Sequence, residues 1–134
     1  MSEKKTHQGG CHCGAIRYEA VLDVSRGGRC NCSICLKSSV TGALVKPHEL
    51  VVTKGEDVAA VYAWGAKTSK RYFCPICGIH VFGRGHLAEL GGDYASVNMN
   101  TLDDVDPIHV KVQHWDGRHD NWEAGPSDQP YALM

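Results

Sequence analysis

The sequence lacks a long hydrophobic run, a strong excess of charge of one sign and a basic tract. No stretch approaches the roughly 18 apolar residues that a membrane-spanning helix needs. Lysine and arginine number 14 against 15 aspartate and glutamate residues, which leaves a formal net charge of −1. A chain this balanced has no general attraction to nucleic acid or to anionic lipid. We therefore expect neither a membrane nor a nucleic acid among its partners.

An apolar export segment is also missing, as are internal repeats, low-complexity tracts and linkers. The start of the chain is polar, carries Lys4 and Lys5 and is not followed by an apolar stretch, so we expect no signal peptide and a cytoplasmic location. The length of 134 residues is typical of one domain. Such a chain buries roughly two-thirds of the surface that it exposes when unfolded. We therefore expect a single hydrophobic core.

The sequence does contain a series of short strand patterns separated by glycine and proline. Apolar and polar residues alternate from Ile16 to Leu22, and again, most cleanly, from Ile108 to Val112. Further strands are expected at 40–45, 50–53, 71–73, 79–82 and 95–99, whereas 58–64 also suits a short helix. Residues 116–134 are expected to cross the sheet as an irregular strap. The pattern predicts a single all-β domain.

Seven cysteines are the most informative residues in the chain. The cytosol keeps thiols reduced, and an odd count does not suit a fully paired disulfide framework, so metal binding is the better explanation. The cysteines fall into two sets. The three-cysteine cluster is Cys30, Cys32 and Cys35 in a C-x-C-x-x-C spacing, and the four-cysteine cluster is Cys11, Cys13, Cys74 and Cys77.

The four-cysteine cluster has enough sulfurs to close a zinc site. Cys74 and Cys77 form a zinc turn in which both sulfurs reach one ion at about 2.3 Å, and Gly78 permits a positive φ after it. Cys11 and Cys13 would supply the other half. Because the two halves are far apart in sequence, a shared metal would contribute to folding, and we expect a structural zinc. The alternative is that one thiol of the first pair is free and that His80 or His12 completes the site.

The three-cysteine cluster has no fourth cysteine left to it. Water, a substrate thiol or a more distant side chain would take the last position on a zinc ion. Three thiolates give zinc a formal charge near −1, which favours uptake of a thiol over the generation of hydroxide. Two alternatives stay open. A second structural zinc could be completed by His48, His86 or His114, or Cys32 and Cys35 could form a redox pair.

The segments that carry these cysteines resemble one known family. The segments 10–14, 30–35 and 73–78, together with Val97-Asn98 and 102–104, resemble the glutathione-dependent formaldehyde-activating enzyme family, which includes the domain of centromere protein V. The resemblance covers residues 8–131 and leaves 1–7 as a flexible N-terminal segment. It implies an all-β, zinc-binding β-tent fold of short antiparallel strands. It also implies a structural zinc on the four-cysteine cluster and a catalytic zinc on the three-cysteine cluster.

The resemblance further implies a reaction between a thiol and an aldehyde. The family joins glutathione and formaldehyde to give S-hydroxymethylglutathione, formally a carbon–sulfur lyase reaction in reverse. Arg29, Lys37 and Arg71 are candidates to pair with peptide carboxylates or are simply solvated charges. Trp115 and Trp122 either wall a pocket or pack the tail on the sheet. The rival interpretations are a non-catalytic zinc-binding interaction module and a DNA-binding module, the latter disfavoured by the near-neutral charge.

Overall fold

The computed structural model describes residues 3–64 and 68–134. Within these residues the chain forms ten strands, one short α-helix and six single-turn 3-10 helices. The strands are β1 Lys5–Gly10, β2 Arg17–Leu22, β3 Arg26–Cys30, β4 Gly42–Val45, β5 Leu50–Lys54, β6 Ala60–Ala63, β7 Ser69–Phe73, β8 His80–Leu87, β9 Gly92–Asn98 and β10 Lys111–Trp115. The helix α1 spans Ser33–Ser38, and the 3-10 turns are η1 Pro47–Glu49, η2 Ala88–Leu90, η3 Met99–Thr101, η4 Pro107–His109, η5 Gly117–His119 and η6 Trp122–Ala124.

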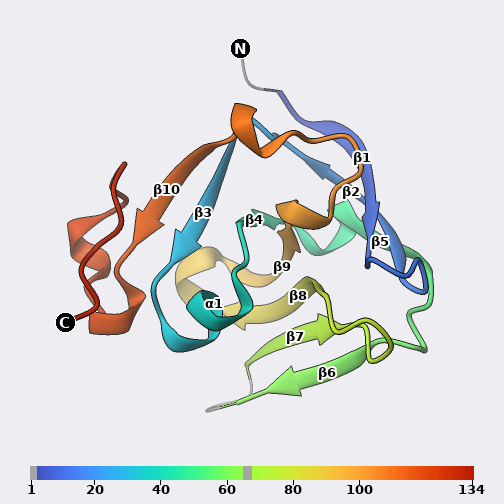
Figure 1. Cartoon of the computed structure of the whole chain (residues 1–134). Coiled ribbons are helices and arrows are strands. Elements are labelled where there is room, and N and C mark those ends of the chain that lie inside the picture. The colour runs from blue at the N-terminus through green and yellow to red at the C-terminus, as the bar shows by residue number, and fades with distance from the viewer. Residues whose placement is uncertain (1–2, 65–67) are drawn as a thin grey trace.

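The strands make two sheets that lean against each other, with α1 on the concave side of the larger one (Figure 1). The smaller sheet has the order β1-β2-β5, and the larger has the order β10-β3-β4-β9-β8-β7-β6. Neighbouring strands are antiparallel except for β10 and β3, which are parallel. The expected all-β, single-domain fold is confirmed. The parallel pair is the one departure from the expected antiparallel arrangement.

The core lies between the two sheets, and its centre is the inward face of β2. Ile16, Tyr18, Ala20 and Leu22 are all buried, so the alternating pattern of this segment confirms the predicted strand. The Tyr18 ring meets the Phe82 ring edge-on at a centroid distance of 6.4 Å, and its hydroxyl lies 2.7 Å from the Thr101 hydroxyl. The phenol therefore buries its ring without leaving its oxygen unpaired.

Two further strand predictions have clear outcomes. The segment 71–82 forms the expected hairpin, because β7 and β8 are antiparallel and joined through the Cys74–Cys77 turn. The ambiguous segment 58–64 is a strand, β6, at the edge of the larger sheet. The hairpin matters for the site because it holds two of the cysteines at its tip.

The strand predicted from Ile108 to Val112 begins later than expected. Pro107 starts the 3-10 turn η4, and the Asp106 carboxylate accepts a hydrogen bond from the Ile108 backbone N–H at 3.0 Å. Proline has a fixed φ and no N–H to donate to a ladder, so it favours a turn at this point. Strand β10 consequently starts at Lys111, and Ile108 is 79% exposed.

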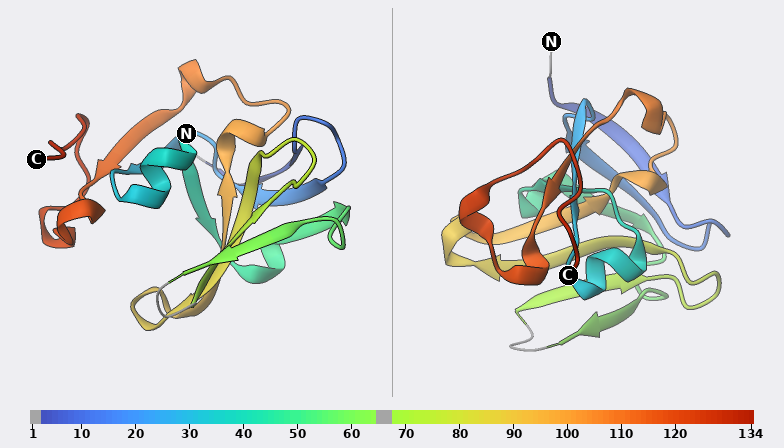
Figure 2. Two further views of the ribbon diagram at one scale, coloured as in Figure 1. Left: turned by 60° about the horizontal axis from the view of Figure 1, so that its bottom comes forward. Right: turned by 60° about the vertical axis from the view of Figure 1, so that its left-hand side comes forward.

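The segments near both ends of the described chain attach to the sheets. Strand β1 begins at Lys5, inside the segment 1–7 that we expected to be flexible, and His7 is buried with its ring nitrogen 3.1 Å from Asp104. The C-terminal strap, residues 116–134, does not cross the sheet but lies at its β10 edge (Figure 2). It is fixed there by two backbone hydrogen bonds between His114 and Ser127 of 2.8 and 2.9 Å.

Among the residues that the structure describes, none of the helices has the length and apolarity to cross a membrane.

Candidate metal centres

The four-cysteine cluster is built from two tight turns. The backbone carbonyl of Cys11 accepts a hydrogen bond from Gly14 N–H at 3.3 Å, and that of Cys74 accepts one from Gly78 N–H at 2.7 Å. Gly14 and Gly78 have φ values of +82° and +80°. Only glycine adopts this conformation at little cost, so each glycine lets its turn fold back and present two sulfurs on one side.

The sulfurs of this cluster have the spacing of a tetrahedral zinc site. All four sulfurs lie within 4.8 Å of one another. The Cys13 sulfur lies 3.7 Å from that of Cys11 and 3.6 Å from that of Cys74. A tetrahedron with a metal–sulfur distance of about 2.3 Å has edges of roughly 3.8 Å. The donor set therefore fits zinc. The alternative ligands His12 and His80 lie outside this group.

The three-cysteine cluster joins the end of a strand to the start of a helix. Cys30 is the last residue of β3, Cys32 is the N-cap of α1, and Cys35 lies in its first turn. Residues three apart share one face of a helix, and Cys30 approaches that face from β3. As a result the three sulfurs lie within 4.8 Å of one another. The helix itself was not predicted, because the sequence analysis treated this segment only as a ligand loop.

No fourth protein ligand joins the three-cysteine cluster in the part of the chain that the structure describes. Among residues 3–64 and 68–134, no histidine, aspartate or glutamate has a ligand atom within 4.8 Å of all three sulfurs. His48, His86 and His114, which the second-structural-zinc alternative required, are outside the group. His86 instead pairs with Asp93 at 2.8 Å. The cluster therefore offers three sulfurs and no further protein ligand of these types in the described residues.

Three thiols this close cannot all ionise without a compensating cation. Contact with Cys30, and then with Cys35, lowers the pKa of the Cys32 thiol. Contact with Cys30 and Cys32 raises the pKa of Cys35 well above its ordinary range. One thiolate therefore forms at the expense of its neighbours, as expected for like charges in one site. A divalent cation bound by the three sulfurs would remove this conflict.

Arg71 supplies a positive charge at the edge of the cluster. Its Nη2 lies 3.1 Å from the Cys35 sulfur, and its guanidinium carbon lies 5.7 Å from the centroid of the Trp64 ring. Strand β7 therefore positions a fixed cation beside the sulfurs. The other two candidates differ. Arg29 donates to the hydroxyls of Thr41 and Ser39, at 3.0 and 3.1 Å, and Lys37 is exposed.

Asn31, between the first two cysteines, ties the cluster to the C-terminal strap. Its Nδ2 donates to Asp116 at 2.8 Å, and its Oδ1 accepts from the Arg118 backbone N–H at 2.9 Å. Arg118 Nε also donates to the Asn31 carbonyl at 3.0 Å. Hydrogen bonding from Asn31, followed by that from His119, lowers the pKa of the buried Asp116 carboxyl. No local sequence pattern predicted these contacts, because Asn31 and Asp116 are 85 positions apart.

The strap also packs directly on Cys30. A β-carbon placed on Gly117 would lie 2.4 Å from the Cys30 sulfur and 2.8 Å from the Trp122 ring. The rings of Trp115 and Trp122 are tilted at 45° with centroids 6.3 Å apart. Trp122 therefore packs with the strap on the β10 edge. Of the two predicted alternatives, this is the packing of the tail on the sheet.

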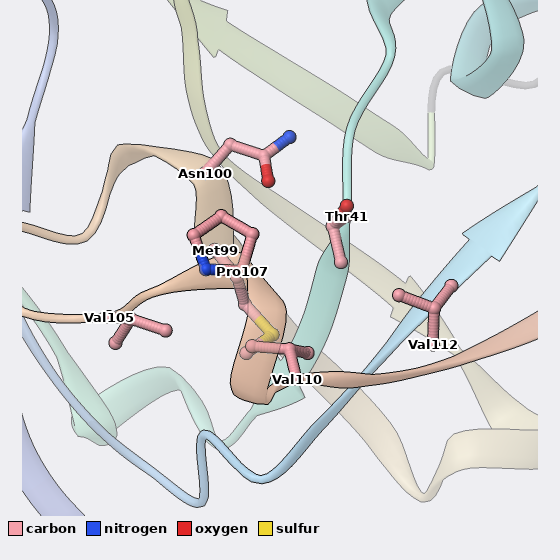
Figure 3. A pocket seen from close by; sticks show the side chains of 7 residues that line it. All are labelled: Thr41, Met99, Asn100, Val105, Pro107, Val110 and Val112. Atoms are coloured by element: carbon pink, nitrogen blue, oxygen red, sulfur yellow. The ribbon is translucent and has the colours of Figure 1, made fainter.

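A separate apolar pocket contains no group of reactive side chains like the two cysteine clusters. It is lined by Thr41, Met99, Asn100, Val105, Pro107, Val110 and Val112 (Figure 3). No charged or metal-ligating side chain lines it. The two cysteine clusters are thus the places in the described residues where reactive groups converge.

The sequence model described as "Glutathione-dependent formaldehyde-activating enzyme" (GFA) matches residues 6–118, which is most of the chain. The chain belongs to the GFA family. Its membership agrees with the resemblance noted from the cysteine motifs. The match includes all seven cysteines, so both clusters lie within the matched segment.

Two fungal relatives of this GFA-family chain carry the name "Putative glutathione-dependent formaldehyde-activating enzyme". The protein from Penicillium rubens is 36% identical over an alignment of 84 residues, with a coverage of 55% of this chain and 41% of the relative. The protein from Emericella nidulans is 36% identical over an alignment of 121 residues, with a coverage of 85% of this chain and 54% of the relative. The chain thus spans about half the length of these relatives.

A solved structure shares the fold. The crystal structure of a Rhodobacter sphaeroides protein superposes with a TM-score of 0.65 at 30% sequence identity, covering 75% of this chain and 92% of that one.

Proposed function

We propose that this chain is a zinc-dependent enzyme of the carbon–sulfur lyase type. It joins a thiol to an aldehyde, as in the formation of S-hydroxymethylglutathione from glutathione and formaldehyde. The three-cysteine cluster carries the proposal, because its sulfurs converge with no fourth protein ligand among the described residues. A site with three protein ligands keeps one position for a ligand from solution. The names of the family and of the fungal relatives support glutathione and formaldehyde as the partners.

Cys30, Cys32 and Cys35 would hold the catalytic zinc, which supplies the Lewis acidity that keeps an incoming thiol in its thiolate form. The chain's own residues then set the geometry around that thiol. Asn31 and the strap hold the cluster in place through Asp116 and Arg118. Arg71 adds a positive charge beside Cys35. Holding thiol and aldehyde in one orientation lowers the entropic part of the barrier.

The four-cysteine cluster would hold a second, structural zinc. Its sulfurs link the turn after β1 to the tip of the β7–β8 hairpin, so metal binding contributes free energy to folding. Free thiols at both clusters require a reducing compartment, which supports a cytoplasmic location.

Metal content and exchange kinetics test the proposal together. Two-dimensional exchange NMR with 13C-labelled formaldehyde measures how fast the glutathione adduct forms and breaks at equilibrium. The purified protein should hold two zinc ions per chain and accelerate this exchange. Cys32→Ser should lose one zinc and the acceleration, whereas Ser33→Ala, a change at the next residue, should keep both.

A protein that holds zinc but leaves the exchange rate unchanged, across several thiols and aldehydes, would refute the enzymatic proposal. The non-catalytic zinc-binding module would then be the better interpretation. A Cys32→Ser variant that retains two zinc ions and full acceleration would remove the three-cysteine cluster from the mechanism.

A further inference from the structure

A small pocket adjoins the three-cysteine cluster through Arg71. Its lining includes Val40, Arg71, His80, Phe82, Ser96 and Asn98, and we call it the Arg71 pocket. Arg71 belongs to both places, because it lines the pocket and its Nη2 lies 3.1 Å from the Cys35 sulfur. A molecule in this pocket would therefore sit next to whatever is bound at the cluster.

The sheet creates the pocket by aligning two polar side chains on either side of a glycine. Arg71 pairs with Gly83 across β7 and β8, and Gly83 pairs with Ser96 across β8 and β9. Paired residues on neighbouring strands present their side chains on the same face. A β-carbon on Gly83 would lie 2.6 Å from the Ser96 hydroxyl oxygen. Glycine at this position therefore lets the Ser96 hydroxyl approach the backbone of β8 closely, on the face that Arg71 shares.

His80 lines the pocket and has an unpaired ring nitrogen. Its Nδ1 is buried and has no hydrogen-bond partner among the residues that the structure describes. The residue is nevertheless held firmly, since its ring stacks on Phe73 at 5.5 Å and its backbone carbonyl accepts from Asn98 Nδ2 at 2.8 Å. Buried polar atoms without a partner are rare in folded proteins. An oxygen atom bound in the pocket would supply the missing partner.

The size of the pocket restricts what can enter it. Its volume is about 20 Å³, and one water molecule requires about 10–15 Å³ of such volume. There is room for a group of very few heavy atoms. The carbonyl group of a one- or two-carbon aldehyde meets this limit, whereas a large acyl or aromatic group does not.

We propose that the Arg71 pocket receives the carbonyl group of the aldehyde and that Arg71 is a catalytic residue that stabilises the alkoxide formed there. This inference rests on the proposed thiol–aldehyde reaction. The thiolate sulfur forms a bond to the carbonyl carbon, and the π-electron pair of the C=O bond moves to the oxygen. The alkoxide then takes one proton from water to give the neutral hydroxyalkyl thioether.

Negative charge thus moves from sulfur to an oxygen two bonds away during the reaction. Arg71 lines the pocket and its guanidinium lies beside the sulfurs, so it is placed to stabilise the charge as it forms on the oxygen. Stacking on Trp64 holds the guanidinium in place beforehand, and preorganised charge of this kind stabilises a transition state most effectively. Loss of one such donor commonly lowers kcat by about 10²–10³.

The test compares Arg71→Gln and Arg71→Lys with the control Arg84→Gln. Arg84 is an arginine on the neighbouring strand that packs over Phe82 and makes no contact with the cysteines among its described interactions. Arg71→Gln should lower the glutathione–formaldehyde exchange rate by about 10²–10³ while keeping two zinc ions and the Kd for glutathione alone. Arg71→Lys should recover part of the rate, and Arg84→Gln should retain all of it.

A binding measurement without turnover provides a second readout. Formate is a small anion that imitates the charge on the alkoxide, and its binding should shift the indole N–H signal of Trp64 in the NMR spectrum. Arg71→Gln should raise the Kd for formate at least tenfold, and Arg84→Gln should leave it unchanged. Val40→Ala, which enlarges the pocket, should increase the rate with acetaldehyde relative to formaldehyde.

The outcomes separate this inference from the proposed function. If the wild-type protein accelerates exchange and Arg71→Gln stays within threefold of it, Arg71 is not catalytic although the proposed function stands. If both Arg71 variants lose zinc or glutathione affinity along with the rate, Arg71 only positions the cluster, which also overturns the inference. A wild-type protein that does not accelerate exchange defeats the proposed function itself.

Discussion

Replacing Gly117 by alanine should damage the three-cysteine cluster while sparing the rest of the fold. The new β-carbon would lie 2.4 Å from the Cys30 sulfur, whereas non-bonded heavy atoms prefer roughly 3.5–4.0 Å. The φ of Gly117 is outside the left-handed region, so the backbone itself tolerates alanine. The new β-carbon would therefore overlap the Cys30 sulfur by more than about 1 Å, and it would also press on the Trp122 ring 2.8 Å away.

The strap cannot easily move away to relieve this contact. Asp116 and Arg118, the residues on either side, are both hydrogen-bonded to Asn31. Cys30 must give way instead, and rotation of its side chain takes its sulfur out of the cluster. Overpacking of this kind costs about 1–3 kcal/mol. If that cost falls on metal binding, the zinc affinity of the three-cysteine cluster drops by roughly 5- to 150-fold.

Competition with a chromophoric zinc chelator measures the two affinities separately. Gly117→Ala should weaken one zinc site within that range and leave the other unchanged. The control is Gly28→Ala on β3, whose β-carbon would meet Trp115 at an ordinary 3.5 Å. Equal zinc affinities in the two variants would show that the strap moves to make room for the added methyl group. That result would refute the inference that its hydrogen bonds to Asn31 hold it rigidly.

Three further predictions concern the core and the metals. Cys74→Ser should lose the zinc of the four-cysteine cluster and unfold at a much lower temperature, because a fully buried thiolate ligand is removed; Ile76→Ser, on the same turn but 70% exposed, should match the wild type in zinc content and circular dichroism. Stepwise removal of zinc with a chelator should expose three reactive thiols before the far-UV circular dichroism changes. If the thiols become reactive and the circular dichroism is lost at the same chelator concentration, the division into one open and one closed zinc site is contradicted. Burial raises the pKa of Tyr18 to about 12. The stability that depends on a protonated phenol is therefore complete below about pH 10 and is lost between about pH 10 and 12. The loss amounts to roughly 2–3 kcal/mol in all. Difference titration of wild type and Tyr18→Phe at 295 nm checks this, and a tyrosine that ionises near pH 10 in the folded protein would disprove it.

Local sequence patterns were sufficient to predict the two cysteine clusters and several strands. The division of seven cysteines into four and three follows from short spacings and zinc-turn glycines, and the structure gathers the sulfurs in those groups. The alternation from Ile16 to Leu22 predicts β2 because one face of that strand is wholly buried. In both cases the deciding patterns are short stretches of sequence, although Cys13 and Cys74 of the four-cysteine cluster are 61 positions apart.

Features that depend on contacts between distant segments, or on a turn that interrupts a strand pattern, could not be predicted from the sequence. The period-2 signal at Ile108 was overridden by Pro107 and the Asp106 side chain, whose turn replaces the first part of the strand. The bonds of Asn31 to the strap join positions 85 apart, and no local pattern reveals them. Arg71 was a candidate partner for a peptide carboxylate, and its contact with a cysteine sulfur could not be read from the local sequence.

Strand β7 connects the two cysteine clusters at close range. Cys74 follows directly after its last residue, and Arg71, two residues before that end, reaches Cys35. The orientation of Arg71 is thus fixed by the same hairpin that carries Cys74 and Cys77 at its tip. Loading of zinc into a newly made chain should be ordered, because the closed cluster must assemble before the guanidinium is in position at the open one. A cell short of zinc would then accumulate folded, half-metallated and inactive protein instead of unfolded chains.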